Sequence, residues 1–192
     1  GEGSGFVVSA DGFIVTNYHV IEGADDIQVV FDNGDIVAAK LVGSDPKTDL
    51  AVLKIDGKKS LDFVTFGNSD SARVGDWVIA IGNPFGLGGT ATTGIISARG
   101  RNIQSGPFDD FIQIDAPINF GNSGGPALNE NGEVVGVAFS GEDDTRTQNM
   151  GYIIPTMIIE FFLDMVRKYK AFDGICSLGI TVQELSNSAL RE

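Results

Sequence analysis

The chain has 192 residues, of which 42% are hydrophobic and 20% charged, and its formal net charge is −13. These proportions are ordinary for a globular protein with a sizeable core, and the length suits one large domain or two small ones. No apolar run is long enough to cross a bilayer as a helix. The acidic balance argues against nucleic acid as a partner, because phosphate binding uses clustered Lys and Arg.

The scarcity of cysteine and histidine excludes several kinds of site. Cys176 is the only cysteine and His19 the only histidine, so the sequence predicts no internal disulfide and no metal site. No phosphate-binding or dinucleotide motif is present, and we expect neither a cofactor nor ATP dependence. The chain opens without a basic, apolar leader, so we expect a mature or trimmed form.

Short apolar runs separated by turn signals fill the first three quarters of the chain. Asp11 and Gly12 separate the first two runs and residues 32–35 the next two, which is typical of β-hairpins. Many short strands and 26 glycines predict an all-β barrel or sandwich. The predicted strands are 6–8, 13–15, 27–31, 36–42, 50–55, 77–81, 94–97, 111–114 and 134–139.

One helix is predicted after Pro155, a residue that suits a first helical position. Glu160 lies early in it, and Arg167, Lys168 and Lys170 lie late, which suits the helix dipole. We expect its apolar side to be buried against the barrel, and an interaction helix is the alternative. The apolar residues at helical spacing are Ile158, Phe161, Phe162, Met165, Val166 and Tyr169.

The segment 121–126, Gly-Asn-Ser-Gly-Gly-Pro, surrounds Ser123 with residues that leave a hydroxyl accessible. It also fits the G-x-S-x-G elbow of α/β-hydrolases such as lipases and esterases. Those enzymes place their histidine after the serine, whereas His19 precedes Ser123. A histidine, then an acid, then a serine is the order found in chymotrypsin.

A serine hydroxyl needs a base within hydrogen-bond reach, and that base must be oriented. We therefore predict Ser123 as the nucleophile, His19 as general base and then general acid, and Asp49 as the residue that orients the imidazole. Asp45 competes with Asp49. Asp49 is preferred because it directly precedes the apolar run 50–55, which can bury and fix it. The backbone N–H groups of Gly121 and Ser123 are the candidate oxyanion hole.

Segments 16–21, 48–55 and 115–126 resemble the catalytic segments of the HtrA/Deg serine proteases, and segment 81–86 resembles that family too. The resemblance extends from residue 3 to about residue 169. It implies a chymotrypsin-like fold of two six-stranded β-barrels with the active site between them. It also implies a domain boundary, with a protease domain at 1–170 and a linker with the truncated start of a PDZ domain at 171–192.

The same resemblance implies the function: ATP-independent endopeptidase action on unfolded or damaged proteins, in the periplasm or otherwise outside the cytoplasm. Relatives of this kind assemble from trimers, so we expect a homo-oligomer. The alternative is a chaperone or peptide-binding module on a protease fold whose active site is poorly formed. A digestive-type protease is disfavoured, because such secreted enzymes are usually rich in disulfides.

The resemblance also implies a substrate site. Its primary specificity pocket would be lined by Ile118 and the strand Val137, Ala138 and Phe139, with Asn119 and Phe120 also binding substrate. No acid stands at the base of this pocket, where the chain has Pro117 and Ile118. We therefore expect cleavage after small or medium apolar residues. Phe120 and the acidic segment 141–148 depart from the family pattern and leave finer specificity open.

Overall fold

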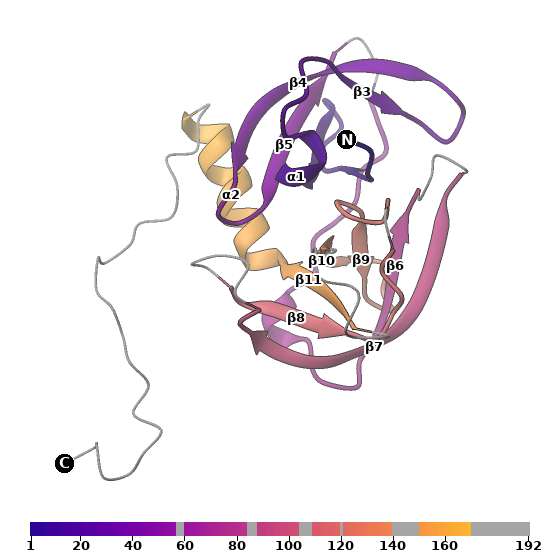
Figure 1. Cartoon of the computed structure of the whole chain (residues 1–192), viewed down its shortest axis with the longest axis vertical. Helices are drawn as coiled ribbons and strands as arrows, with labels where there is room; N and C mark the ends of the chain where they lie inside the picture. Colours follow the sequence, from indigo (N-terminus) through magenta and orange to yellow (C-terminus); the bar gives the residue numbers. More distant parts are fainter. Residues whose placement is uncertain (57–59, 84–87, 104–108, 120, 140–149, 170–192) are drawn as a thin grey trace, which may run out of the picture.

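Two antiparallel β-sheets, one from each half of the chain, meet beside a C-terminal helix (Figure 1). The computed structural model describes residues 1–56, 60–83, 88–103, 109–119, 121–139 and 150–169. The predicted all-β class with a C-terminal helix is confirmed. The expected start of a PDZ domain at 171–192 lies outside the described residues.

The N-terminal sheet has five strands in the order β1-β2-β5-β4-β3. Both predicted hairpins are present, since Phe6 pairs with Val15 across the first and Val30 with Ile36 across the second. A short helix, α1 (Tyr18–Ile21), directly follows β2 and was not predicted. The strands are β1 (Phe6–Val7), β2 (Phe13–Asn17), β3 (Ile27–Val30), β4 (Ile36–Asp45) and β5 (Leu50–Ile55).

This first sheet differs from the expected six-stranded barrel. Within the described residues it has five strands, and its edge strands β1 and β3 are not paired with each other. Strand β1 is only two residues long, so it offers little backbone for closure. A cavity of about 590 Å³ lies in the opening, lined by residues of β1, β2, β3 and the segment 81–83.

The C-terminal half forms a closed barrel in the order β10-β11-β8-β7-β6-β9. Strand β7 is longer than predicted, and β9 and β11 were missed. Both missed strands are short and have a proline at one end, which weakens their strand pattern. The strands are β6 (Trp77–Gly82), β7 (Thr90–Arg101), β8 (Phe111–Ile114), β9 (Pro126–Leu128), β10 (Val134–Phe139) and β11 (Gly151–Pro155); a 3₁₀ turn, η1 (Ser69–Ser71), precedes β6.

Helix α2 (Thr156–Tyr169) begins one residue later than predicted, because Pro155 is the last residue of β11 and pairs with Gly136. Its start is fixed by Thr156, whose buried Oγ1 donates to Gly67 O at 2.9 Å and accepts from Ser69 N at 3.1 Å. The side chain thus satisfies one backbone group just before η1 and one at its first residue.

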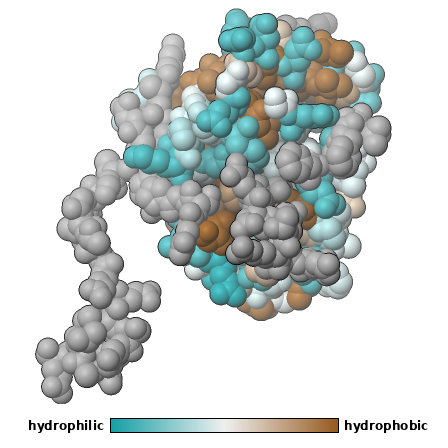
Figure 2. Space-filling view, in the orientation of Figure 1, coloured by the Kyte–Doolittle hydropathy of each residue, from teal (hydrophilic) through white to brown (hydrophobic). Residues whose placement is uncertain are grey.

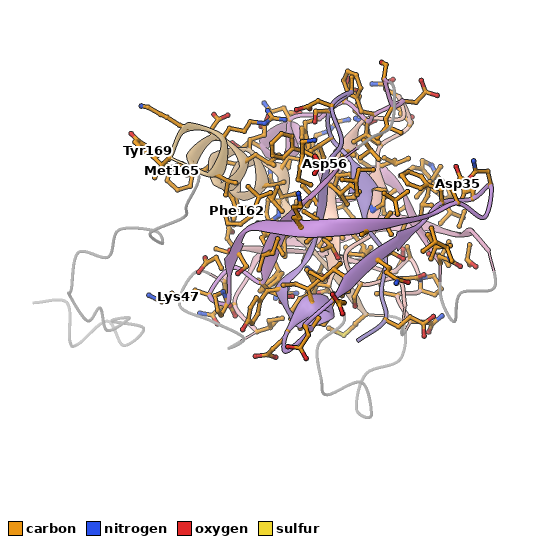
Figure 3. The ribbon with its side chains drawn as sticks, turned by 90° about the horizontal axis from the view of Figure 1, so that it is seen from above. Asp35, Lys47, Asp56, Phe162, Met165 and Tyr169 are labelled. Atoms are coloured by element: carbon orange, nitrogen blue, oxygen red, sulfur yellow. The ribbon has the colours of Figure 1, made fainter. Side chains whose placement is uncertain are left out.

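The buried face of α2 consists of Ile159, Phe162, Leu163 and Val166, an i, i+3, i+4, i+7 pattern. The predicted face was wrong at Phe161 and Tyr169, which are 46% and 55% exposed. The buried side chains join one core cluster with residues of both sheets, among them Leu50, Val52, Val137 and Ile154. In Figure 3, Phe162 lies on the side of the helix toward the strands, while Tyr169 lies at its outer end.

The surface is mixed in character. Figure 2 shows apolar areas among polar ones over the N-terminal sheet, where Val30 and Ile36 are largely exposed. None of the described helices is long and apolar enough to cross a membrane.

Phe162→Ala is expected to lower the free energy of unfolding by about 3–5 kcal/mol, because its ring is fully buried where the helix and both sheets meet. Phe161→Ala, one residue earlier on the exposed side, is expected to cost about 1 kcal/mol or less. Denaturant unfolding of both variants measures the difference. Equal losses would contradict this assignment of the helix faces.

Candidate active site

His19 and Asp49 lie together at the point where β2 ends and β5 begins. His19 belongs to α1, and its ring Nδ1 is 2.7 Å from Asp49 Oδ2. The backbone N–H of His19 also donates to the other carboxylate oxygen, Oδ1, at 2.9 Å. One carboxylate therefore fixes both the ring and the main chain of the histidine. The imidazole is 38% exposed and the carboxylate 13%, so the ring keeps one side open to a reactant.

The backbone of Asp49 is in the left-handed region, with φ of 54°. Aspartate tolerates this conformation better than most residues, and such backbone outliers concentrate at functional sites. Its carbonyl oxygen accepts hydrogen bonds from Tyr18 N at 3.1 Å and Asn17 Nδ2 at 3.0 Å. Both the carboxylate and the carbonyl of Asp49 thus bind the segment that carries His19.

The competing acid, Asp45, serves a different purpose. Its Oδ2 accepts from Thr48 Oγ1 at 2.8 Å and from Thr48 N at 3.2 Å, and its Oδ1 accepts from Lys47 N at 3.3 Å. The carboxylate is buried and closes the turn between β4 and β5. Of the two candidate acids, Asp49 is the one whose carboxylate is hydrogen bonded to His19.

Tyr18 precedes the histidine and faces Glu22, whose Oε1 accepts its hydroxyl at 3.2 Å. Partial burial raises the pKa of the phenol, and the neighbouring carboxylate raises the pKa further. Tyr18 is therefore a neutral neighbour at physiological pH and not a second base.

Ser123 lies in a tight turn before β9 and is 5% exposed. Directly before it, Asn119 O accepts a hydrogen bond from Asn122 N at 3.0 Å, and Gly121 between them has φ of 92°. A positive φ at the third residue of a four-residue turn favours glycine. The glycine at 121 supplies a conformation that other residues adopt only at a cost.

The turn leaves two backbone donors unused. Within the described residues, neither the N–H of Gly121 nor that of Ser123 donates a hydrogen bond. The carbonyls of the same two residues are both engaged, since Ser4 Oγ donates to Gly121 O at 2.5 Å and Ser4 N to Ser123 O at 2.9 Å. Free N–H groups on a fixed turn are what an oxyanion hole requires.

The predicted substrate-binding strand β10 lies against this turn. Gly124 N donates to Ala138 O at 3.0 Å, and Ala138 N donates to Gly125 O at 2.8 Å. Phe139 packs its ring edge-on to His19, with centroids 6.1 Å apart. Val137 is fully buried in the core cluster between the sheets. Strand β10 therefore contacts both the ring of His19 and the turn around Ser123 (residues 121–125, the nucleophile turn).

Two of the remaining predicted substrate residues, Ile118 and Asn119, lie just before the same turn. Ile118 is partly buried and close to Gly151, where a Cβ would lie 2.7 Å from Ile118 Cγ1. Asn119 is exposed. Phe120 lies outside the described residues.

Ser123 and α1 approach each other through small residues. A Cβ on Gly124 would lie 3.0 Å from Asn17 N, and a Cβ on Gly3 would lie 3.2 Å from Ser123 O and 2.5 Å from Val20 Cγ2. Among the described residues, no hydrogen bond joins Ser123 Oγ to the imidazole. The structure therefore places the turn that carries Ser123 close to the segment that carries His19, and Asp49 holds the histidine.

Comparison with known proteins bears directly on this arrangement. Residues 3–137 match the model of the trypsin-like peptidase domain family. This chain belongs to the trypsin-like peptidases. The fold class predicted from the sequence is that of the family.

Curated relatives of this trypsin-like peptidase are named probable periplasmic serine endoproteases, DegP-like. The protein from Brucella suis biovar 1 (strain 1330) is 61% identical over 137 residues, which are 71% of this chain and 27% of the relative. The protein from Rhizobium meliloti (strain 1021) is 47% identical over 191 residues, 96% of this chain and 37% of the relative. The chain therefore spans only about a third of the length of these relatives.

A solved structure titled "HtrA-type protease AlgW with decapeptide" superposes with a TM-score of 0.83 at 46% identity. The match covers 88% of this chain and 52% of that chain. Together with the curated relatives, it confirms the predicted resemblance to the HtrA/Deg serine proteases.

Two supports of the peptidase site were not predicted from the sequence. One is Ser4, which binds the nucleophile turn. The other is Gly82, where a Cβ would lie 2.5 Å from Asn122 Oδ1 and 2.7 Å from Asn122 Cα. Gly82 belongs to segment 81–86, which resembles the HtrA/Deg family. The sequence therefore marked this segment, but no role was predicted for it. The sequence around Ser4 contains mainly small residues, which gave no signal of this contact.

Gly82→Ala is expected to lower the free energy of unfolding by about 1–3 kcal/mol, because the new methyl group would overlap the backbone and side chain of Asn122. Gly89→Ala is the matched control, since no atom lies within 4 Å of a Cβ there. We expect its effect to stay within about 0.5 kcal/mol. Thermal and denaturant unfolding compare the two, and a Gly82 variant as stable as the control would contradict the close packing.

Proposed function

We propose that this chain is the protease domain of an HtrA/Deg-type serine endopeptidase that uses Ser123, His19 and Asp49. The observation that carries the proposal is the contact of 2.7 Å between His19 Nδ1 and Asp49 Oδ2, together with a serine turn in which two N–H groups have no acceptor among the described residues. A hydrogen bond between serine and histidine is often long before substrate binds, so its absence from the free enzyme is compatible with this role.

Asp49 fixes the proton of the imidazole on Nδ1. With that N–H donated to the carboxylate, Nε2 carries the lone pair that accepts the Ser123 proton. The carboxylate also stabilises the imidazolium that forms during attack. The second bond, from His19 N to Oδ1, keeps the helix from rotating the ring away.

The reaction then follows acyl transfer. Ser123 Oγ attacks the scissile carbonyl carbon while its proton passes to Nε2, and the carbonyl oxygen becomes an oxyanion bound by the N–H groups of Gly121 and Ser123. The imidazolium returns the proton to the leaving amine. Water, activated by the same histidine, releases the acyl group from the serine. Each oxyanion donor contributes about 3 kcal/mol of transition-state stabilisation.

Asp49→Asn is expected to lower kcat by about 10⁴-fold, because an amide stabilises the wrong imidazole tautomer. Asp45→Asn is the matched control, since its carboxylate binds Thr48 and Lys47. We expect the control to keep its kcat and to lose about 1–3 kcal/mol of stability. Peptide hydrolysis with unfolding measurements separates the two effects. If Asp45→Asn lost kcat and Asp49→Asn kept it, the acids would have to be exchanged.

We propose an apolar specificity pocket with Ile118 and β10 as its walls, together with Asn119 and Phe120. Its expected base holds Pro117 and Ile118. The nearby acid Asp115 accepts the N–H of Ile95 at 2.6 Å, and it serves the pairing of β7 with the chain after β8. A pocket that selects Lys or Arg needs a buried carboxylate for the substrate cation.

A peptide library is therefore expected to show cleavage after Val, Ala or Leu, because these side chains fill an apolar pocket without leaving a charge unpaired. Mass spectrometry of the products identifies the residue before each cut. Dominant cleavage after Lys or Arg would refute the apolar pocket.

The setting follows from the relatives, whose names place them in the periplasm. We propose that the whole protein works outside the cytoplasm, without ATP, on unfolded or damaged proteins, and as a trimer-based homo-oligomer. The chain spans only about a third of the length of these relatives, so the protein substrates and the homo-oligomer of the whole protein are proposals too.

β-Casein digestion by the parent and by Ser123→Ala tests the activity, with a fluorophosphonate probe applied to both. We expect cleavage and labelling by the parent alone, since the variant has no nucleophile. Labelling without cleavage would show a competent serine that a protein substrate does not reach. Loss of both in a folded parent would overturn the proposal and favour the binding-module alternative, which suppression of aggregation by Ser123→Ala would then support.

A further inference from the structure

We propose that Ser4 is a positioning residue that holds the nucleophile turn in its open, oxyanion-binding form. This inference rests on the proposed function. It assigns a role in the reaction to Ser4, which is far from Ser123 in the chain. It also gives a role to Asn83, part of the segment 81–86, which the three proposed catalytic residues do not explain.

Ser4 binds the turn at the carbonyls of both proposed oxyanion residues, Gly121 and Ser123. Its hydroxyl donates to Gly121 O at 2.5 Å, and its backbone N–H donates to Ser123 O at 2.9 Å. Each carbonyl belongs to a peptide plane whose N–H is also engaged: Asn122 N binds Asn119 O, and Gly124 N binds Ala138 O. Both planes are therefore held at both ends.

The N–H of Ser123, one of the oxyanion donors, lies in the plane between the two that Ser4 holds. The carbonyl of this middle plane, Asn122 O, accepts from Gly125 N at 2.9 Å, so three successive planes are fixed. Gly121 has no Cβ to restrict rotation. Without the Ser4 hydroxyl its carbonyl loses a partner, and the plane between Gly121 and Asn122 can rotate, which moves the adjoining plane and the donor N–H of Ser123 out of line with the oxyanion.

Ser4 is itself anchored from both halves of the molecule. Thr16 Oγ1 of β2 donates to Ser4 O at 2.7 Å, and Asn83 N, just after β6, donates to Ser4 Oγ at 2.8 Å. Asn83 Oδ1 in turn accepts from Gly88 N at 2.8 Å. The hydroxyl therefore donates one hydrogen bond and accepts one within the protein, which fixes its direction. The alignment of the turn depends on the contact between the two sheets.

The test compares Ser4→Ala with the parent and with Ser9→Ala. Ser9 is a matched control, because its hydroxyl accepts a backbone N–H, that of Phe13, at 3.2 Å in the neighbouring hairpin. The readouts are kcat and KM on a peptide substrate, affinity for a peptide boronate that mimics the tetrahedral intermediate, and the melting temperature.

We expect Ser4→Ala to lower kcat about 10- to 100-fold, up to the loss caused by removing one oxyanion donor. KM should change little, because the interaction is made in the transition state. Boronate affinity should fall with kcat. Ser4→Thr, which keeps a hydroxyl, should retain most of the activity, and Ser9→Ala should match the parent.

An unchanged kcat in Ser4→Ala overturns the proposal. The proposal is also overturned if Ser9→Ala loses as much kcat as Ser4→Ala and both variants show the same drop in melting temperature. If Ser4→Ala does not fold, Ser4→Cys replaces it, since a thiol is similar in size but a weak hydrogen-bond partner. Parent-like kcat in the folded cysteine variant then overturns the proposal. A folded parent that neither cleaves peptide nor takes the fluorophosphonate probe refutes the proposed function itself, before any variant is compared.

Discussion

The position of His19 depends on the unusual backbone of Asp49, whose φ of 54° presents both a carboxylate and a carbonyl to the same short helix. Four hydrogen bonds then join Asp49 to the segment Asn17, Tyr18 and His19. Helix α1 has only four residues, too few to be stable alone. Its position is therefore set by Asp49, and β5, whose first residue Leu50 is fully buried, fixes Asp49 in turn.

The nucleophile turn depends on the other sheet and on the N-terminal segment. Strand β10 holds it at Gly124 and Gly125, and Ser4 holds it at Gly121 and Ser123. Helix α2 packs into the core cluster shared by both sheets, so burial of its apolar face also fixes how the halves meet. Packing of α2 against both sheets thus fixes the two halves that carry His19 and Ser123, and Ser4 joins the N-terminal segment to the turn that carries Ser123.

Much of the fold could be predicted because apolar runs and turn residues are local signals. The bounds predicted for β5, β8 and β10 match the structure. Strand β9 was missed because it has only three residues and follows glycines. Strand β11 was missed because it continues directly into helix α2. Neither segment carries a clear strand pattern in the sequence. Chain order and chemistry led to the prediction of His19, Asp49 and Ser123, and the structure brings the first two into contact. Ser4 binds Gly121 across 117 residues, a contact with no local signal.

The small residues around the serine have a packing cause that is separate from catalysis. A Cβ on Gly125 would overlap Ile81 O, and one on Gly124 would overlap Ser4 O. A Cβ on Gly82 would meet Asn122. The turn is pressed between β6 and the N-terminal segment. A side chain at Gly82 or Gly125 would push the turn away from β6, and one at Gly124 would push it away from Ser4 and β2. These glycines thus let the turn lie close enough to the N-terminal segment for Ser4 to reach the carbonyls of Gly121 and Ser123.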